Sequence, residues 1–449
     1  MSQQIELLAQ YVASASWDDV PAAARHRTKL VLLDTIGVVL AGARCQDVQA
    51  FRERVASTGG TGATVLAPGW IRTDPRMAAM LNALAGRAIE MSEGLRGLQS
   101  GVHVVPAVLA VGEWRKSTGR QMLEAILFGY EVAGRLNKGF KPRALSHPNG
   151  QISLLAAVAA TARLYGFDGR GLSLALRIAT TALMTPSYTS TAAGATTLNL
   201  PAGMSGVVAA LAPELVLAGF CAQDDAIEEA LGEMVGDKFE ATGLTDGLGD
   251  SWQILEGYFR FYACCNPIYP ALDSLQDVLA VLKPKPADIA RIDAETFAFA
   301  TNMCRQDPIN YFASKYSFPH AAATLIVRGG LNFSKIDESA LNDPAISALR
   351  HKIYMTEDPS MTALGPTLKP ARVTVTLTDG RRATADCTNC KRDSTPTDPE
   401  PQIREKFREL AGTTLPPEGV HQIERAVDRC EDWASPDELF ALLRRHAPS

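Results

Sequence analysis

The 449-residue sequence carries little excess charge of either sign. Acidic residues number 49 and basic residues 44, which gives a formal net charge of -5. No stripe of lysine and arginine interleaved with aromatic residues occurs, and such a stripe is the usual electrostatic footprint of nucleic-acid binding. We therefore expect no nucleic-acid partner.

An export signal and long hydrophobic runs are also missing. The N-terminal stretch "MSQQIELLAQYVASASWDDV" has no basic segment followed by an apolar one, so it does not resemble a secretory signal. The longest weakly polar stretches are alanine-rich and short, or are interrupted by Pro213 and Glu214. We interpret them as buried helices rather than membrane spans, and we expect a cytoplasmic protein that does not bind membranes.

Several catalytic and metal-binding motifs are absent. The sequence contains neither G-x-S-x-G nor H-E-x-x-H, the usual sequence support for serine hydrolases and zinc peptidases. Its 8 cysteines are irregularly spaced, and the pair Cys387 and Cys390 has no second, similarly spaced pair. We therefore expect reduced thiols and no metal site.

Helical spacing of apolar residues dominates the chain up to about residue 270. "AARHRTKLVLLDTIGVVLAG" predicts a helix that ends at Gly42, and "DPRMAAMLNALAGRAIEMSEG" predicts another. No convincing strand pattern occurs before residue 285. The sequence thus predicts an all-helical unit.

Strand patterns begin after this unit. "LKPKPADIARIDAETFAFA" contains a candidate strand, and "ARVTVTLTDGRRATADC" alternates Val and Thr across an Asp-Gly turn, which predicts a hairpin. Helices return in "QIREKFRELAG" and "PDELFALLRRHA". We therefore expect a mixed α+β unit over residues 271–395, and residues 396–449 to rejoin the helical unit formed by residues 1–270.

Two of the seven histidines follow helix-breaking stretches. His103 comes after "GLQSG" and His147 after "GFKPRALS". A histidine at the start of a buried helix can titrate near neutral pH and transfer protons; the alternative is a core or capping role. Glu90 and Glu93 would share one face of a helix near the turn before His103, unless they belong to a solvated helix end.

A lone arginine lies in the aromatic segment "YFRFYACCNPIYPALD". Arg260 in apolar surroundings needs an anionic partner, because burying an unpaired guanidinium costs several kcal/mol or more. That partner is either a protein carboxylate or the carboxylate of a substrate, which arginine is well shaped to bind.

Taken in order, eight stretches resemble the MmgE/PrpD family, which includes 2-methylcitrate dehydratase, cis-aconitate decarboxylase and iminodisuccinate epimerase. The resemblance covers nearly the whole chain. The stretches are "LVLLDTIGVVLAG", "NALAGRAIEMSEG", "GVHVVPAVLAVGE", "GYEVAGRL", "HPNGQISLLAAVAATARLYGFD", "ASKYSFPHAAATLIVRGG", "VTLTDGRRATAD" and "REKFRELAG".

The resemblance implies a mainly α fold. A large all-helical domain, discontinuous in sequence, carries an inserted smaller α+β lid domain, and the protein forms a homodimer. It also implies a cleft between the two domains that binds a small polycarboxylic acid without a metal or an organic cofactor.

The resemblance also carries over to individual positions. His103 falls on the histidine of the family's H-P-S-type motif, with the proline three positions later, and His147 falls on the second active-site histidine. Other positions depart from the family pattern. Glu93 stands for an aspartate, Gly97 for a threonine, Leu198 (beside Asn199) for a lysine, Arg260 for a lysine and Tyr269 for a histidine, while Lys315 and Tyr316 occupy the basic stretch before Ser317.

These positions support the hypothesis of a cofactor-independent lyase of the dehydratase type. It assigns His103 as base or acid, and Tyr269 or Glu93 as the opposing proton donor. The substrate binders are Arg260, His147, Asn199 and Lys315. Arginine stays charged, so Arg260 should bind rather than abstract.

Other readings of the same residues stay open. Epimerisation through the same deprotonated intermediate is the first alternative, decarboxylation is another, and a binding protein without catalysis is the third. Loss of a positive charge at Leu198 indicates a substrate with fewer, or differently placed, carboxylates.

Overall fold

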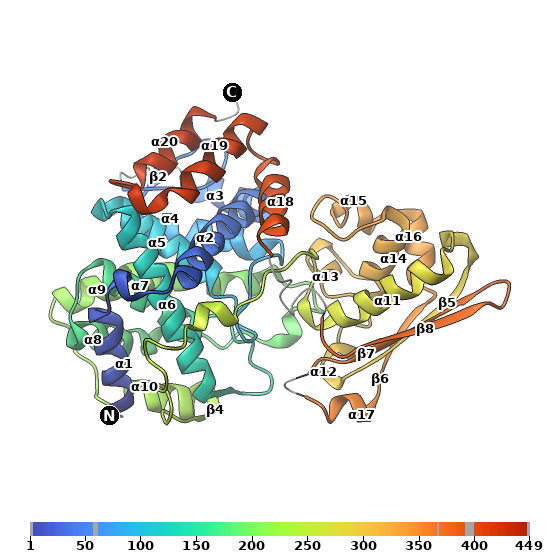
Figure 1. Ribbon diagram of the computed structural model, residues 1–449, viewed down its shortest axis with the longest axis horizontal. Helices are drawn as coiled ribbons and strands as arrows, with labels where there is room; N and C mark the ends of the chain where they lie inside the picture. Colours follow the sequence, from blue (N-terminus) through green and yellow to red (C-terminus); the bar gives the residue numbers. More distant parts are fainter. Residues whose placement is uncertain (1–2, 57–61, 366–367, 391–398, 447–449) are drawn as a thin grey trace.

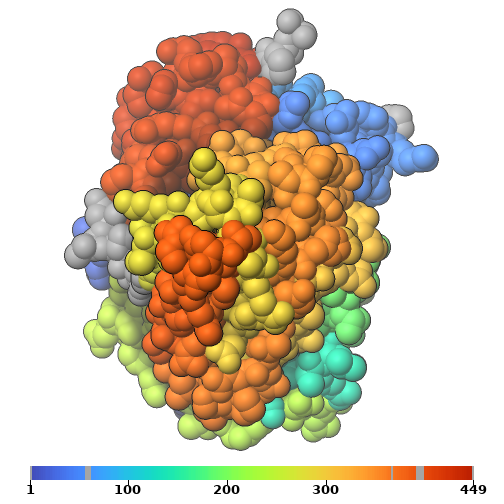
Figure 2. Space-filling view, turned by 90° about the vertical axis from the view of Figure 1, so that its right-hand side faces the viewer, coloured from blue at the N-terminus to red at the C-terminus, as the bar shows by residue number. Residues whose placement is uncertain are grey.

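The chain folds into a helical part and a smaller α+β part that lie side by side (Figure 1). The computed structural model describes residues 3–56, 62–365, 368–390 and 399–446. Figure 2 views the molecule from the side of the α+β part, in yellow and orange, which covers most of that face; the C-terminal helices, in red, lie at its upper left.

The helical part combines helices from both ends of the chain. Its N-terminal helices are α1 (Gln3–Ser14), α2 (Ala22–Gly42), α3 (Gln46–Ala56), α4 (Pro75–Ala88), α5 (Gly101–Arg115), α6 (Gly119–Gly139), α7 (Ile152–Leu164), α8 (Gly169–Ala179), α9 (Leu200–Leu217) and α10 (Ala226–Glu229). Its C-terminal helices are α18 (Glu400–Ala411), α19 (Pro417–Asp428) and α20 (Asp437–Arg445). The predicted helical character of this region is confirmed.

Small residues let these helices pack closely. Each residue of α7 from Ile152 to Ala162 is buried, and the helix packs against α5, α6 and α9. The predicted end of α2 at Gly42 is confirmed and has a steric reason. A Cβ on Gly42 would lie 1.8 Å from the carbonyl oxygen of Ala85 in α4, so only glycine fits there.

The apolar segment that contains α9 is less buried than expected. Among the described residues, Thr196–Leu217 is the helical stretch long and apolar enough to cross a membrane by length and composition, with a mean hydropathy of 1.6. Half of it is buried, against α4, α5, α7 and α8. The prediction of two buried helices is thus met by α7 and only half met by α9.

Strands also occur before residue 285, so the sequence interpretation of that region was wrong in this detail. One antiparallel pair joins β1 (Ala63–Thr64) to β2 (Arg72–Thr73), and another joins β3 (Phe140–Pro142) to β4 (Gly236–Phe239). The strands are too short for an alternating pattern to stand out from the sequence around them.

The α+β part is built on a sheet with strand order β6-β5-β7-β8. Strands β5 and β6 are parallel, whereas β7 pairs antiparallel with β5 and β8. The predicted strand and hairpin are therefore confirmed. The strands are β5 (Ile289–Thr296), β6 (Ile353–Glu357), β7 (Ala371–Leu377) and β8 (Arg382–Cys387); the helices are α11 (Tyr269–Leu282), α12 (Ala298–Thr301), α13 (Tyr311–Ser314), α14 (Phe318–Arg328), α15 (Glu338–Leu341), α16 (Pro344–Arg350) and α17 (Pro359–Thr362).

Helix α18 returns the chain to the helical part. It packs against α2, where the buried Lys406 ammonium lies 2.7 Å from the Asp34 carboxylate. It also lies on the side that faces the α+β part (Figure 1), and its Leu410 belongs to the apolar cluster centred on that part. The domain boundaries near residues 270 and 396, and a lid role for the α+β part, stay predictions.

Candidate active site

A cavity of about 620 Å³ lies between the helical and the α+β parts. Its walls come from five separate stretches of the helical side and from two stretches of the α+β part. The helical side contributes Glu90, Gly97, Gln99, Pro142, Arg143, Ala144, Ser146, His147, Pro148, Tyr188, Tyr258, Arg260, Cys265, Asn266 and Pro267, and the α+β part contributes Phe297, Ala298, Phe299, Thr362, Gly365, Leu368 and Lys369.

The loop between α4 and α5 sends its two glutamates in different directions. Helix α4 ends at Ala88, earlier than predicted, and Glu90 has a positive φ of 57°. This left-handed conformation reverses the chain, so Glu90 reaches the cavity wall while Glu93 turns into the helical core. The expectation that they share one helix face is therefore wrong.

Glu90 is the centre of a buried charged cluster. Its carboxylate lies 2.6 Å from Nη1 of Arg260 and also pairs with Arg87. The Tyr316 hydroxyl donates to it at 2.9 Å, and the Gln99 amide donates at 3.1 Å. Burial opposes ionisation, but the two guanidinium groups outweigh it and lower the pKa of Glu90 to about 2. Two cations and one anion leave a surplus of one positive charge.

His103 is fully buried in the first turn of α5. Its Nδ1 lies 2.8 Å from the Gln99 carbonyl oxygen, which can only accept, so Nδ1 carries the proton and Nε2 carries the lone pair. Within the described part of the chain Nε2 has no hydrogen-bond partner. Burial lowers the pKa of His103 to about 4, so the ring is neutral at pH 7. His103 is not among the described residues that line the cavity. It is connected to the cavity wall by its hydrogen bond to Gln99, which does line it.

His147 lines the cavity directly and has the opposite tautomer. Its Nδ1 accepts from the backbone N–H of Asn149 at 3.2 Å, so the proton of the neutral ring is on Nε2. Burial, reinforced by the positive charge of Arg87, lowers the pKa of His147 to about 3. One histidine therefore offers a basic nitrogen and the other an N–H donor.

Glu93 and Tyr269 lie behind the cavity rather than among the described residues that line it. The Glu93 carboxylate accepts from the Tyr130 hydroxyl and from the Gly101 backbone N–H at the start of α5. Burial raises the pKa of Glu93 to about 7. The Tyr269 hydroxyl donates to the Tyr262 carbonyl oxygen at 2.6 Å, and the two rings meet edge to face.

Asn199 and Lys315 are separated from the other predicted site residues. Asn199 lines another cavity, of about 380 Å³, together with Cys45, Asn310 and Tyr311. Lys315 is buried; its ammonium donates to the Ile336 carbonyl oxygen at 2.9 Å and lies 4.1 Å from the centre of the Tyr311 ring. Burial lowers the pKa of Lys315 to about 8. The large cavity thus brings together Arg260, His147 and, through Gln99, His103.

Sequence reasoning missed the aromatic residues of the cavity. Tyr188, Phe297 and Phe299 lie in segments without a catalytic motif, and Lys369 follows the end of α17. The only available signal was a local one, the aromatic pair in "ETFAFA" at the end of β5. Nothing in the sequence indicates that Phe299 of this pair meets Tyr188, or that Tyr188 meets His147.

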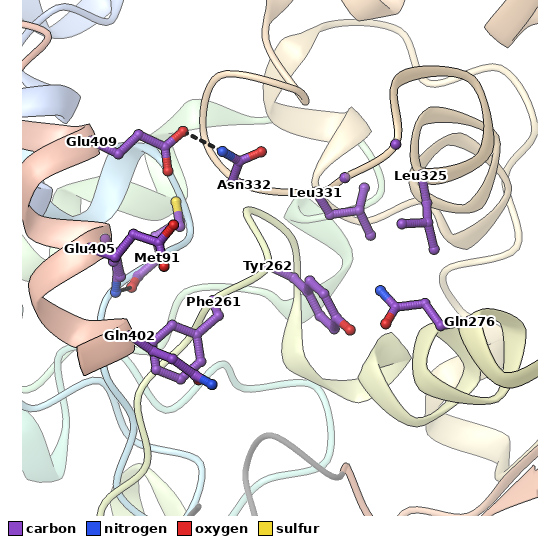
Figure 3. Close-up of a pocket in the computed structure, with 13 residues that line it drawn as sticks. Met91, Phe261, Tyr262, Gln276, Leu325, Leu331, Asn332, Gln402, Glu405 and Glu409 are labelled. Atoms are coloured by element: carbon purple, nitrogen blue, oxygen red, sulfur yellow. Dashed lines mark hydrogen bonds between the residues drawn. The ribbon is translucent and has the colours of Figure 1, made fainter. Parts of the chain in front are cut away.

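A further cavity of about 280 Å³ lies beside α18 (Figure 3). Glu405 and Glu409 project from α18 into this region, and Glu409 binds Asn332. These carboxylates repel an acidic ligand, so this cavity fits the predicted substrate class poorly. Among the described residues, no group of three or more His, Cys, Asp or Glu side chains is arranged to hold a metal ion.

Comparison with known protein families identifies the family of the chain that carries these two histidines and this cluster. The chain belongs to the MmgE/PrpD family: the N-terminal domain of the family matches residues 6–236, and the C-terminal domain matches residues 262–432. The resemblance predicted from the eight stretches is thereby confirmed.

The curated relatives match the chain over nearly its full length. Cis-aconitate decarboxylase of Aspergillus terreus is 22% identical over 471 residues, covering 97% of this chain and 95% of that protein. The cis-aconitate decarboxylase-like protein oryM of Aspergillus oryzae is 24% identical over 472 residues, covering 97% and 96%. The low identity agrees with a divergent member of the family.

Proposed function

We propose that the protein is a lyase that removes a proton next to the carboxylate of a small organic acid and expels water. The observation that carries this proposal is the pair of neutral histidines with opposite tautomers beside the Arg260 cluster. Removing a proton next to a carboxylate requires a base at the carbon and positive charge near the carboxylate oxygens. Arg260 in the cavity wall offers the positive charge, and His103, behind the wall residue Gln99, offers the base.

In this proposal the substrate carboxylate binds at Arg260, where the Glu90 cluster has its surplus positive charge. Nε2 of His103 takes the proton from the carbon next to the carboxylate; this role requires the substrate to reach His103 past Gln99. The electron pair forms the new double bond as the hydroxyl leaves from the next carbon. The Nε2–H of His147 hydrogen-bonds the leaving hydroxyl, which departs as water with the proton that His103 took from carbon.

The donor role falls to His147 rather than to Tyr269 or Glu93, because His147 faces the cavity with an N–H. Glu93 and Tyr130 instead hold the start of α5, and so act on the position of His103. Asn199 and Lys315 are proposed to support the neighbouring cavity, and a contact with the substrate would need a rearrangement of that region.

Decarboxylation is the second candidate, and the curated relatives favour it. In that reaction the bond between carbon and carboxylate breaks, carbon dioxide leaves, and the electron pair stays on carbon. A proton from solvent then adds to that carbon, beside the N–H of His147. No base is required for this sequence, so His103 would only assist binding. His103 is thus required as a base for dehydration but not for decarboxylation, and this difference distinguishes the two reactions.

Proton exchange in deuterated water distinguishes the reactions. The protein is mixed with hydroxy- and amino-polycarboxylic acids, with cis-aconitate and with 3-hydroxy monocarboxylic acids that carry alkyl or aryl groups, and the protons next to the carboxylates are followed by NMR. New alkene signals mean dehydration, stereoisomer signals mean epimerisation, and deuterium at the carbon that loses carbon dioxide means decarboxylation. No change in any acid would overturn the proposal in favour of a binding protein.

Variants separate catalysis from binding. His103→Ala should abolish dehydration while leaving affinity for the acid within about tenfold, because the ring acts in the transition state. His421→Ala is the matched control, since that side chain is 53% exposed on α19. Loss of affinity without loss of turnover would assign His103 to binding. Homodimer formation and a cytoplasmic location stay predictions from the sequence.

A further inference from the structure

One wall of the large cavity is aromatic. The Tyr188 ring lies over the His147 imidazole, with centroids 4.7 Å apart and an interplanar angle of 34°. The Phe299 ring meets Tyr188 edge to face at 4.8 Å and 86°. These three rings form a continuous surface from His147 to the solvent side, where Phe299 is 38% exposed.

Other apolar side chains extend this surface around the cavity. Phe297 and Leu368 come from the α+β part, and Tyr258, two residues before Arg260 in the sequence, also lines the cavity. The volume of about 620 Å³ falls within the range of about 300–1,000 Å³ that suits drug-sized ligands. The cavity therefore has room, and apolar surface, for much more than a compact acid.

The buried charge of the cavity is small by comparison. Arg87 and Arg260 share Glu90, so the three groups contribute one net positive charge. Arg143 also lines the cavity, but its side chain is exposed and its guanidinium donates to the Glu233 carbonyl oxygen. The Lys369 ammonium donates to Asn266 at the cavity edge. The buried cluster, with one surplus charge, suits one carboxylate, and the two other cations lie toward the more exposed part of the cavity.

We propose that the substrate carries one carboxylate, bound at Arg260, and an aryl or large alkyl group that packs against Tyr188, Phe297 and Phe299. This inference rests on the proposed function. It adds to the reaction centre an aromatic surface that selects the substrate. Its physical basis is the apolar area that such a group removes from water, together with ring contacts of the kind that aromatic walls favour. A compact polycarboxylic acid would leave this wall uncovered, and its additional carboxylates would meet only Arg143 and Lys369, which already donate to Glu233 and Asn266.

Binding of unreactive acids tests this inference without relying on turnover. The probes are 3-phenylpropanoate, butanoate and tricarballylate, none of which has a hydroxyl to lose. Isothermal titration should show 3-phenylpropanoate binding tighter than either of the others by about tenfold or more. Equal affinities, or tighter binding of tricarballylate, would overturn the proposed substrate class.

Variants connect the preference to the aromatic wall. Phe299→Ala should remove most of the preference for 3-phenylpropanoate over butanoate, and it should leave butanoate binding within about threefold. The partial exposure of Phe299 favours a folded variant. Phe220→Ala is the matched control, because that ring is 57% exposed and is not among the described residues that line the cavity. A preference that survives in Phe299→Ala would also contradict the proposal.

A reactive set distinguishes failure of this inference from failure of the proposed function. 3-Hydroxy-3-phenylpropanoate would lose a proton from the carbon next to the carboxylate and its hydroxyl group, giving cinnamate and water. Malate and 3-hydroxybutanoate are the compact counterparts. Turnover of the compact acids alone would support the lyase and overturn the aromatic substrate. Tight binding of the phenyl acids with no turnover or exchange would keep the specificity surface and overturn the lyase.

Discussion

The Arg260 guanidinium lies 2.6 Å from the Glu90 carboxylate in the wall of the large cavity. The sequence left open whether this arginine has a protein partner or a substrate partner. The structure gives it a protein carboxylate that is also shared with Arg87, and the shared arrangement leaves positive charge in excess. Arg260 is therefore an ion-pair partner of Glu90 and also the cation of this cluster that lines the cavity.

Replacing the shared anion should destabilise the protein strongly. Glu90→Gln leaves Arg87 and Arg260 buried next to each other without a counter-charge, which should lower the free energy of unfolding by about 3–5 kcal/mol. Denaturant unfolding followed by circular dichroism measures this change. Glu418→Gln on the exposed surface of α19 is the control and should change it by no more than about 0.5 kcal/mol. Similar effects for the two variants would contradict the importance of the cluster.

Removing one cation should affect ligand binding more than folding. Arg260→Gln leaves the Arg87 and Glu90 pair, so the cluster becomes neutral and no longer attracts a carboxylate. Affinity for an acid probe should fall by about tenfold or more, whereas the stability loss should be smaller than in Glu90→Gln. Titration calorimetry and unfolding of the same samples compare the two effects. Unchanged affinity would show that the carboxylate binds elsewhere.

The raised pKa of Glu93 predicts a specific pH dependence of stability. Burial raises this pKa from 4.5 to about 7, so the folded protein keeps a proton that the unfolded chain releases above pH 4.5. Glu93 therefore contributes stability at low pH that is lost as the pH rises from about 4.5 to 7. The stability of Glu93→Gln relative to the original protein should rise over this window and level off above it. A constant difference across the window would contradict the raised pKa.

The lowered pKa values of the two site histidines predict that activity persists to an unusually low pH. Burial lowers the pKa of His103 to about 4 and that of His147 to about 3, both from 6.5. Activity that depends on their neutral forms should therefore persist well below pH 6.5, and kcat/KM should fall only near pH 4. The same shifts mean that the unfolded chain binds more protons between pH 4 and 6.5, so stability is lost as the pH falls through that range. A fall in kcat/KM as the pH decreases through about 6.5 would contradict the lowered pKa values.

Much of the fold could be predicted because it depends on local periodicity. The end of α2 at Gly42, the strand β5 and the hairpin of β7 and β8 all follow from patterns within about twenty residues. The short strands β1 to β4 could not be predicted, since each depends on pairing with a partner rather than on its own composition.

The sequence by itself determined the helical framework, the family, and the two histidines and one arginine of the candidate site. Only the tertiary structure decided which of these groups meet. The positive φ at Glu90 separates it from Glu93, and two backbone partners assign opposite tautomers to His103 and His147.

The aromatic wall likewise exists only in the folded chain, because His147, Tyr188 and Phe299 come from three distant segments. Periodicity reports whether a side chain is buried, but not what it is buried against. The neighbours of a buried side chain depend on how whole helices and strands pack against one another. In this protein that packing separates Asn199 and Lys315 from the large cavity and places Phe299 in its wall.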